Sequence, residues 1–400
     1  MDRSGVVGVF GMSDVLRSFV QFGGPAYSAV HADGVSVLHV FKYFKPDFTG
    51  DGLYFEKLFP RLEREGVRNE VMVGMTKPAA GAPRQEGVHL FGRTCAKYFN
   101  PMMFLWFLVN AWRFDVIHFH CAIDRFFAYH IIARLFHCRI VQSSTLDDGL
   151  GSIIEGYRPV YRPLIRQLCR LINDFVAISP SLYADSKRAA AAQRVHLIPQ
   201  GVAIPHADGP APRNAVRHAM GVGATDTLLL FVGGICPRKD ARFLVDNHPA
   251  TVGAIHLMLV GPVLDDAYAV ELQRAIAASP SATRIHVSGY MADPSLAYRA
   301  ADAFVFASHK EGCPNVLLEA MAYGLPIISR RLLGTTDSLV AHGGNGILFD
   351  TAEEYSAAVD RLASSPVLRQ SMGAEAHATV CRTFEMDAVA HRYASLYAHA

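Results

Sequence analysis

The chain has 400 residues, of which 51% are hydrophobic and 18% are charged, and its formal net charge is +2. This length suits two domains of ordinary size, each able to bury its own core, and the composition excludes a disordered protein. No tail of like charges and no RNA- or DNA-binding motif is recognisable, so we expect no nucleic-acid partner.

The first 34 residues show no sustained periodicity. Gly5 and Gly8 interrupt an apolar stretch that ends at Asp14, which argues against a signal peptide. We therefore predict that residues 1–34 are a mobile extension or an over-extended start, and that the fold begins at Val35.

From Val35 onward, short apolar runs alternate with amphipathic segments, which predicts parallel sheets joined by crossover helices. In the first half we expect a loop at Lys42–Gly52 and a helix at Leu53–Glu65. The expected strands are Val35–Phe41, Glu70–Met75, Asp115–His120, Arg139–Ser144, Asp174–Ile178 and Val195–Ile198.

Gly50 and Asp51 fall on the predicted loop after the first strand. Doubly wound sheets bind ligands at the carboxyl ends of their strands, so we expect both residues to lie beside a ligand-binding cleft. A plain turn is the alternative for so short a glycine pattern.

Two histidines, His118 and His120, share one face of the strand Asp115–His120. Histidines spaced in this way can bind zinc, but no third ligand with suitable spacing is apparent, so we predict no metal site. We interpret His118 as a hydrogen-bonded core residue. His120, at the carboxyl end of the strand, is predicted to face the cleft.

Two segments bear on location. Pro101–Val109 is strongly apolar but far shorter than the ~20 residues that span a bilayer. Arginines recur every four residues from Arg158 to Arg170, which on one helix makes a basic stripe beside an apolar face. Such a face can contact an anionic membrane, and a solvated face over the core is the bland alternative.

The stretch Pro199–Pro212 is rich in proline, glycine and alanine and predicts a linker. The last expected helix is Met386–Tyr397. The strands expected between them are Thr227–Gly233, Ile255–Val260, Arg284–Val287, Ala303–Ala307, Pro326–Ser329 and Gly346–Phe349.

The strand that ends at Gly233 continues through Gly234 to two cations, Arg238 and Lys239. Glycines let the backbone approach an anion closely, and lysine is a good point charge for a diphosphate. A solvated helix start is the alternative for the two cations.

Two carboxylates, Glu311 and Glu319, flank the start of a predicted helix that Asn315 can cap. A helix N-terminus attracts phosphate, and carboxylates accept hydrogen bonds from paired hydroxyls. The arrangement therefore suits a diphosphate with polyols on both sides, as in a sugar nucleotide. Asp147-Asp148 and Asp265-Asp266 lack the context of a metal-binding D-x-D and are interpreted as turn or cap residues.

The run Ser308–Pro326 resembles the donor motif S-x-x-E-G-F-P-x-x-x-x-E-A-M-A-x-G-x-P of the retaining GT-B glycosyltransferases of family 4, with Cys313 in the usual Phe position. Asp115–His120 resembles the D-V-V-H-x-H strand of the same family. Gly233–Lys239 resembles its G-R-x-x-x-x-K segment, but Gly234 stands where the arginine usually does. Pro199–Ala203 resembles P-N-G-V-D, with departures at the second and fifth positions.

The resemblance implies an α/β protein of the GT-B fold, with two Rossmann-like, doubly wound parallel-sheet domains facing each other across a cleft. It implies an acceptor-binding domain at 35–205, a nucleotide-sugar-binding domain at 206–383, and a C-terminal helix at 384–400 that packs back on the first domain.

Site residues follow from the same resemblance. Glu311 would bind the donor sugar, Glu319 the ribose hydroxyls, and His120 the reacting centre from across the cleft, so we name Glu311, His120 and Lys239 as catalytic. The resemblance also implies an acceptor side formed by Gly50, Asp51 and His120. The predicted donor-binding set is Gly233, Gly234, Arg238, Lys239, Tyr290, Glu311, Gly312, Cys313, Pro314, Asn315, Val316, Leu317 and Glu319.

The implied function is a retaining hexosyltransferase that moves a sugar from a UDP- or GDP-sugar to a saccharide or lipid-linked acceptor in envelope or polysaccharide biosynthesis. It would need no metal and no cofactor. Because Gly234 replaces arginine, a sugar-nucleotide-binding partner without turnover stays open as the alternative. A dinucleotide-dependent oxidoreductase is not favoured, because no G-x-G-x-x-G follows the first strand.

The seven cysteines stand at positions 95, 121, 138, 169, 236, 313 and 381. Their number is odd and no C-x-x-C spacing occurs, which favours reduced thiols. We therefore expect a cytoplasmic protein.

Overall fold

The computed structural model describes residues 34–44, 50–74, 86–92, 100–120, 127–143, 149–190, 194–205, 211–249 and 255–398. The predicted extension lies outside them except for Gly34, and so do Asp147 and Asp148. The five cysteines among the described residues, at 138, 169, 236, 313 and 381, are all free thiols.

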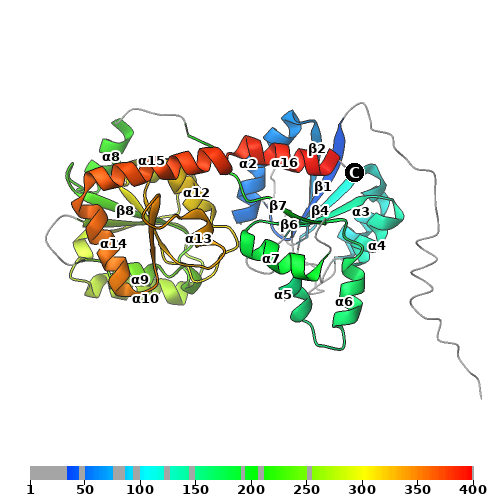
Figure 1. Cartoon of the computed structure of the whole chain (residues 1–400), viewed down its shortest axis with the longest axis horizontal. Coiled ribbons are helices and arrows are strands. Elements are labelled where there is room, and N and C mark those ends of the chain that lie inside the picture. The colour runs from blue at the N-terminus through cyan, green and yellow to red at the C-terminus, as the bar shows by residue number, and fades with distance from the viewer. Residues whose placement is uncertain are drawn as a thin grey trace, which may run out of the picture.

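The described chain forms two lobes, each built on one parallel sheet (Figure 1). In the N-terminal lobe the described strands are arranged in the order β3-β2-β1-β4-β5-β6-β7, and every pair is parallel. Their bounds are β1 Val35–Phe41, β2 Val67–Val73, β3 Val88–Leu90, β4 Val116–Phe119, β5 Arg139–Ser143, β6 Asp174–Ala177 and β7 Val195–Leu197.

Helices cover both faces of this sheet, which explains why its inner strands are continuous buried runs. One face carries α2 (Gly50–Arg64) and the C-terminal helix α16 (Met386–Ala398), whose apolar side chains share one core cluster with β1 and β2. The other face carries α3 (Pro101–Asn110), the 3-10 turn η1 (Ala111–Arg113), α4 (Phe127–Leu135), α5 (Leu150–Glu155) and α6 (Arg162–Cys169). Helix α7 (Pro180–Ala189) contacts β6 and β7.

The C-terminal lobe repeats this plan, with the described strands in the order β10-β9-β8-β11-β12-β13. The strands are β8 Thr227–Val232, β9 Ile255–Val260, β10 Ile285–Gly289, β11 Ala303–Phe306, β12 Ile327–Arg330 and β13 Gly346–Phe349. One face carries α8 Ala211–Ala219, α11 Ser295–Ala300, α12 Asn315–Ala322, α13 Thr336–Leu339 and α15 Pro366–Thr383. The other carries α9 Ala241–Asp246, α10 Asp266–Ala278 and α14 Ala352–Ser364. The 3-10 turns of this lobe are η4 Pro237–Lys239 and η5 Ala282–Arg284.

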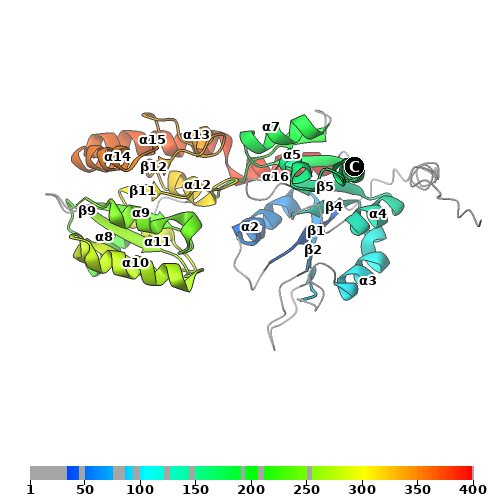
Figure 2. The same ribbon diagram turned by 90° about the horizontal axis from the view of Figure 1, so that it is seen from below.

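The chain crosses back between the lobes at its C-terminal end, where α15 belongs to one lobe and α16 to the other (Figures 1 and 2). Asp387 of α16 forms ion pairs with Arg61 and Arg64 of α2 at 2.9 and 2.8 Å. Val202, in the connection after β7, forms a parallel bridge with Glu385 just before α16. The two crossings therefore lie side by side and connect the lobes at one place.

All the predicted strands are present, each within a few residues of its predicted ends, and Asp265 caps α10 by accepting from the Tyr268 N–H at 2.9 Å. One strand was missed, and two predictions were wrong. Strand β3 was missed, because only three half-buried residues form it. Helix α2 begins at Gly50, so Gly50 and Asp51 lie in its first turn and not on a loop.

The second wrong prediction concerns the basic stripe. The structure breaks the predicted helix at residues 156–161, so that α6 begins only at Arg162. Arg162 donates to the carbonyls of Tyr157 (2.9 Å) and Glu155 (2.6 Å), which closes the end of α5. Only Arg158, Arg166 and Arg170 remain exposed cations there.

Candidate active site

Glu311 lies on the loop between β11 and α12 and is buried. Its Oε1 atom accepts from the Arg238 guanidinium and from Lys239 Nζ, both at 2.6 Å. Arg238 also donates to the Lys310 carbonyl at 2.9 Å, so the two loops are joined. The structure thus brings together three residues predicted for the donor, with two cations around one carboxylate and a net positive charge.

The first turn of α12 lies beside this cluster. Pro314 occupies the N-cap position and Asn315 is the first helical residue, so the predicted cap by Asn315 was wrong. Proline is preorganised for a helix start but has no side-chain acceptor, and Asn315 Oδ1 is buried with no hydrogen-bond partner in the described chain. The first N–H groups of a helix have no intrahelical acceptor, so this end attracts an anion.

A cavity of about 440 Å³ lies between the lobes beside the first turn of α12. Both lobes contribute to its wall, which includes Tyr54, Lys57, Gly233, Gly234, Tyr290 and Glu319. The structure therefore places both glycines, Tyr290 and Glu319 of the predicted donor set around one space, with Asn315 and Val316 beside them.

Glu319 is held from both sides of this cavity. Its Oε2 accepts from the Tyr298 hydroxyl at 3.0 Å, and its Oε1 pairs with Lys57 of α2 at 3.2 Å. Burial, with the Glu319 charge as a second cause, raises the pKa of Tyr298 well above its usual value. Sequence reasoning missed both partners, since neither belongs to a motif.

The glycine turn after β8 is tightly constrained. Gly261 has a φ of +151°, and a Cβ added there would overlap the backbone of Gly233, so both strands approach the cavity as bare backbone. A Cβ added at Gly234 would overlap the side chain of Leu264. Leu264 thus occupies the space into which the family's arginine would extend.

His120 lies just past the end of β4 and is 5% exposed. Its ring stacks on Phe41 at 4.4 Å between centroids, and its Nε2 lies 3.0 Å from Nδ1 of His39. His118 is fully buried, with one ring nitrogen 2.7 Å from the Tyr397 hydroxyl and the other 2.7 Å from Ser143 Oγ.

Sequence spacing indicated that no third ligand accompanies His118 and His120, and this inference was wrong. His39 of β1 is in register with His118 of β4, and the three histidines each offer a ring nitrogen within 4.8 Å of the others. Strand register is not visible in a sequence, which is why His39 was missed. Burial lowers the pKa of His39 to about 3, and the pKa values of His118 and His120 well below their usual range.

The remaining predicted residues are less informative. The side chain of Asp51 lies outside the described residues, so its assignment to the acceptor side stays a prediction. Cys313 packs between the core of the C-terminal lobe and a small cluster formed by Ala177, Ile178 and Leu182 of the N-terminal lobe.

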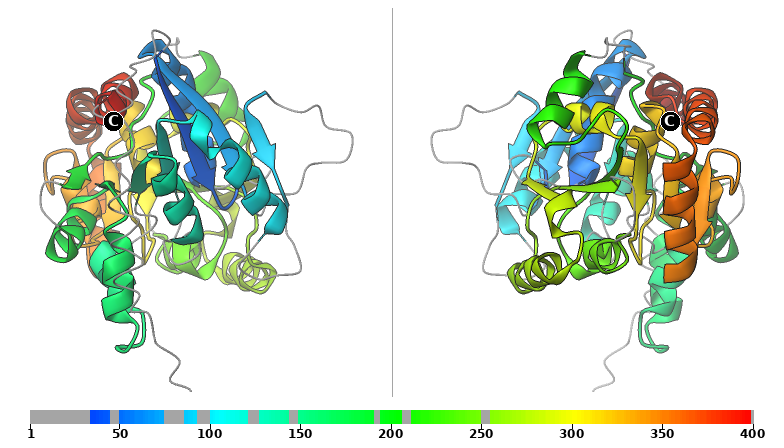
Figure 3. Two further views of the ribbon diagram at one scale, coloured as in Figure 1. Left: turned by 90° about the vertical axis from the view of Figure 1, so that its right-hand side faces the viewer. Right: turned by 90° about the vertical axis from the view of Figure 1, so that its left-hand side faces the viewer.

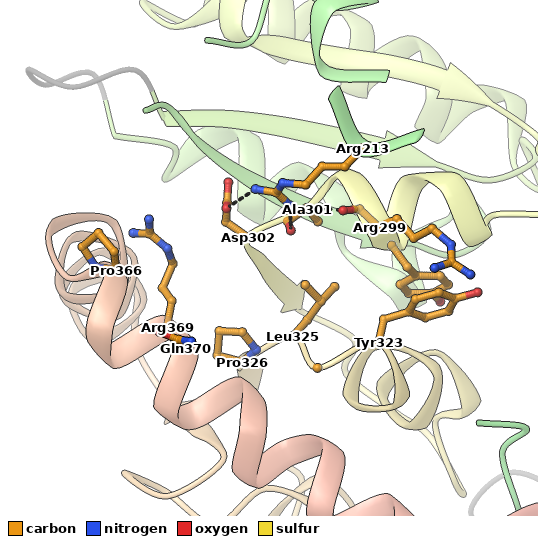
Figure 4. A pocket seen from close by; sticks show the side chains of 12 residues that line it. Arg213, Arg299, Ala301, Asp302, Tyr323, Leu325, Pro326, Pro366, Arg369 and Gln370 are labelled. Atoms are coloured by element: carbon orange, nitrogen blue, oxygen red, sulfur yellow. Dashed lines mark hydrogen bonds and ion pairs between the residues drawn. The ribbon is translucent and has the colours of Figure 1, made fainter. Parts of the chain in front are cut away.

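A second hollow, of about 480 Å³, lies on the C-terminal lobe near Arg213, Asp302 and Arg369 (Figure 4). Arg213 donates to Asp302 and to the Ala301 carbonyl, both at 2.7 Å, so its charge is already compensated. None of the predicted donor-binding residues lines this hollow. We therefore place the candidate active site in the cavity between the lobes.

The two-lobe architecture is that of a GT-B protein. The chain resembles the crystal structure of Anabaena HepE in complex with UDP-glucose, with a TM-score of 0.75, 19% identity, and coverage of 92% of this chain and 100% of that chain. The predicted fold class is confirmed.

Sequence comparison leads to the family. The model described as Glycosyltransferase Family 4 matches residues 50–204, and that described as Glycosyl transferases group 1 matches residues 226–365. The chain belongs to the GT-B glycosyltransferases of the family 4 type, as its motifs predicted.

Two curated relatives give more detail. A D-inositol 3-phosphate glycosyltransferase of Thermobispora bispora is 30% identical over 223 residues, 52% of this chain and 51% of that protein. A lipopolysaccharide core biosynthesis glycosyltransferase, LpsE of Rhizobium meliloti, is 26% identical over 184 residues, 46% of this chain and 53% of that protein. The chain spans about half the length of these relatives.

Proposed function

We propose that the protein transfers a sugar from a nucleotide-sugar donor to a hydroxyl acceptor, with retention of anomeric configuration. The observation that carries this proposal is the convergence of Glu311, Arg238 and Lys239 beside the first turn of α12, next to a cavity that also contains Glu319. Family membership supports it, and the UDP-glucose in the HepE complex favours a UDP-sugar as donor.

The donor fits this site in one direction. Its ribose hydroxyls take the place of Lys57 at Glu319, its diphosphate lies against Lys239, Arg238 and the end of α12, and its sugar reaches Glu311. The base then lies on the side of Tyr290, whose exposed ring can stack on it. Carboxylates are good acceptors for hydroxyls, and a lysine and a helix end are good partners for phosphate.

The chemistry needs a stabilised leaving group. As the bond from the sugar to the diphosphate breaks, negative charge builds on the phosphate oxygens, and the two cations and the helix end lie where they stabilise it. The departing phosphate itself accepts the proton of the acceptor hydroxyl on the same face of the sugar, so no protein base is assigned. Glu311 and His120 hold the sugar between the lobes, and closure of the lobes excludes water.

Gly234 favours one competing function, a sugar-nucleotide-binding partner without turnover. Arg238 can replace the missing arginine, because it already contacts the sugar-binding carboxylate from a neighbouring position.

One experiment separates the two functions. Thermal shift with a panel of UDP- and GDP-sugars identifies the donor, because a bound ligand raises the melting temperature with the logarithm of its concentration. Slow hydrolysis of that donor by the purified protein, lost in Lys239→Ala, is the result we expect. Tight binding with neither hydrolysis nor transfer to cell-envelope acceptors would favour the binding partner.

Activity is expected to survive EDTA. Side-chain cations and a helix end already carry the diphosphate charge, so catalysis should not depend on magnesium. The assay compares initial rates before and after chelation. An absolute requirement that magnesium or manganese restores would contradict this account of the leaving group.

For the acceptor we propose a lipid-linked or membrane-presented saccharide, which requires the protein to contact an anionic membrane from the cytoplasmic side. Among the described residues, no helix has the length and apolarity to cross a bilayer. Helices α3 and α4 lie at the end of the N-terminal lobe remote from the C-terminal lobe (Figures 2 and 3). Large apolar side chains are exposed on α3, η1 and the turn before α6, namely Met102, Leu105, Trp112 and Val160.

Apolar side chains of this kind can enter the headgroup region while exposed arginines attract anionic lipid, each worth about 1 kcal/mol. We expect co-sedimentation with anionic vesicles that falls as salt shortens the Debye length. Glutamine at Arg158, Arg166 and Arg170 should weaken it, whereas glutamine at Arg274, Arg361 and Arg382 of the other lobe is the matched control. Arg162 stays unchanged because it closes α5. Binding that ignores lipid charge and both sets of substitutions would point to a soluble acceptor.

A further inference from the structure

Four aromatic rings, those of His39, Phe41, Phe55 and His118, hold His120 in one orientation at the carboxyl edge of the N-terminal sheet. Phe41 stacks on it, with an interplanar angle of 8°, and the Phe55 ring lies 4.2 Å away between centroids. The ring of His39 is nearly parallel to it, at 15°, and faces it through Nδ1. His120 therefore cannot turn to exchange its two ring nitrogens without disturbing buried neighbours.

Asn69 of β2 fixes the proton on His39. The Asn69 side-chain N–H group donates to the Val67 carbonyl at 3.1 Å, so its Oδ1 is the atom turned toward His39. That oxygen lies 3.0 Å from His39 Nε2 and can only accept a hydrogen bond. The Nε2 atom of His39 therefore carries the proton.

The proton on His120 follows. His39 is neutral because burial lowers its pKa to about 3, and with its proton on Nε2 it has a lone pair on Nδ1. This lone pair accepts from His120 Nε2, 3.0 Å away, so His120 carries its proton on Nε2. Nδ1 of His120 is left with a lone pair, and no described residue donates to it.

We propose that His39 and Asn69 are positioning residues that lock His120 as the Nε2–H tautomer, so that His120 Nδ1 accepts a hydrogen bond from a hydroxyl of the sugar. This inference rests on the proposed function, which places the sugar between the lobes. It deepens that function, because a sugar whose hydroxyl is absent or replaced by an ether oxygen at this position would leave Nδ1 unpaired.

The same histidines are less suited to a metal. Zinc needs ring nitrogens directed at one point about 2.0–2.1 Å away. Both nitrogens of His118 already face hydroxyl groups, and His39 and His120 face each other at hydrogen-bonding distance. The hydrogen-bonded chain from Asn69 through His39 to His120 accounts for the contact between His39 and His120 without a metal.

The tautomer can be read directly in the free protein by NMR with ¹⁵N-labelled histidine, assigned through His120→Gln. We expect His120 to show a protonated Nε2 and an unprotonated Nδ1 at neutral pH. His39→Asn keeps an acceptor oxygen near the position of Nδ1 and should preserve this pattern. His39→Leu, of similar volume but without an acceptor, should mix the two tautomers.

Turnover provides the second readout. His39→Leu should lower kcat by about 10-fold or more with the donor KM nearly unchanged, and His39→Asn should recover most of the loss. Should His39→Leu fail to fold, Asn69→Leu at a half-buried position removes the first acceptor of the chain and should likewise mix the His120 signals.

Three results would overturn the inference: a protonated Nδ1 on His120 in the wild type, an unchanged tautomer in both leucine variants, or stoichiometric zinc in the purified protein. Because the NMR experiment contains no donor, it decides the tautomer whether or not the protein transfers sugar. Failure of the proposed function would instead appear as missing donor turnover.

Discussion

Replacing Glu311 by alanine is expected to lower kcat by about 100-fold, because the donor sugar loses the carboxylate that orients it. The same change should leave the affinity for free nucleoside diphosphate equal to that of the wild type or higher. Glu311 Oε1 pairs with both Arg238 and Lys239 in the free protein, and its removal frees both cations for the phosphates.

Calorimetric titration of UDP measures this directly, with Glu319→Ala as the contrasting variant. Glu319 should accept the ribose hydroxyls, and hydrogen bonds to a charged group are worth roughly 1.5–3 kcal/mol each, so affinity should fall by about 10-fold or more. Glu311→Gln keeps the volume and separates the effect of charge. If UDP affinity falls equally in the two alanine variants, the division of roles between the carboxylates is wrong.

Replacing Arg238 by alanine is expected to lower kcat/KM by about 10²-fold, and adding Gly234→Arg to that variant should restore most of the activity. The reason is that one guanidinium beside the diphosphate is needed, and this chain supplies it from position 238 in place of position 234. The backbone at Gly234 is not left-handed, so an arginine is allowed there. Leu264, which it would displace, is 64% exposed and can move.

The controls are Arg238→Lys and Leu264→Ala. Lysine keeps the charge without the planar fork, so Arg238→Lys should fall between wild type and alanine. Leu264→Ala, added to the double variant, removes the side chain that an arginine at position 234 would have to displace, and should improve the rescue. A folded double variant no more active than Arg238→Ala would show that the two positions do not serve the same oxygen atoms.

Most of the strands and helices could be predicted from local sequence patterns. Mostly apolar runs such as Val35–Phe41 and Ile255–Val260 are typical of strands in a parallel sheet covered on both faces, so their limits could be predicted. The donor loop could also be predicted from the sequence, because Glu311, Glu319 and the start of α12 lie within one short segment. The prediction that Asn315 caps α12 failed because Pro314 occupies the N-cap position.

Contacts between distant segments could not be predicted. His39 meets His120 only through the register of β1 and β4, and Lys57 meets Glu319 only because α2 borders the cleft between the lobes. The break before α6 was missed because arginines every four residues suggested one helix, whereas Arg162 turns inward to the carbonyls that end α5.

The central claim is retaining transfer from a nucleotide sugar, and the anomer of the first product tests it most directly. With an α-linked UDP-sugar that the thermal-shift panel identifies, ¹H NMR during early donor hydrolysis should show the released sugar in the α configuration before it mutarotates, and Glu311→Ala should release almost none. Initial formation of the β-configured product, or wild-type turnover unaffected by Glu311→Ala, would contradict the account.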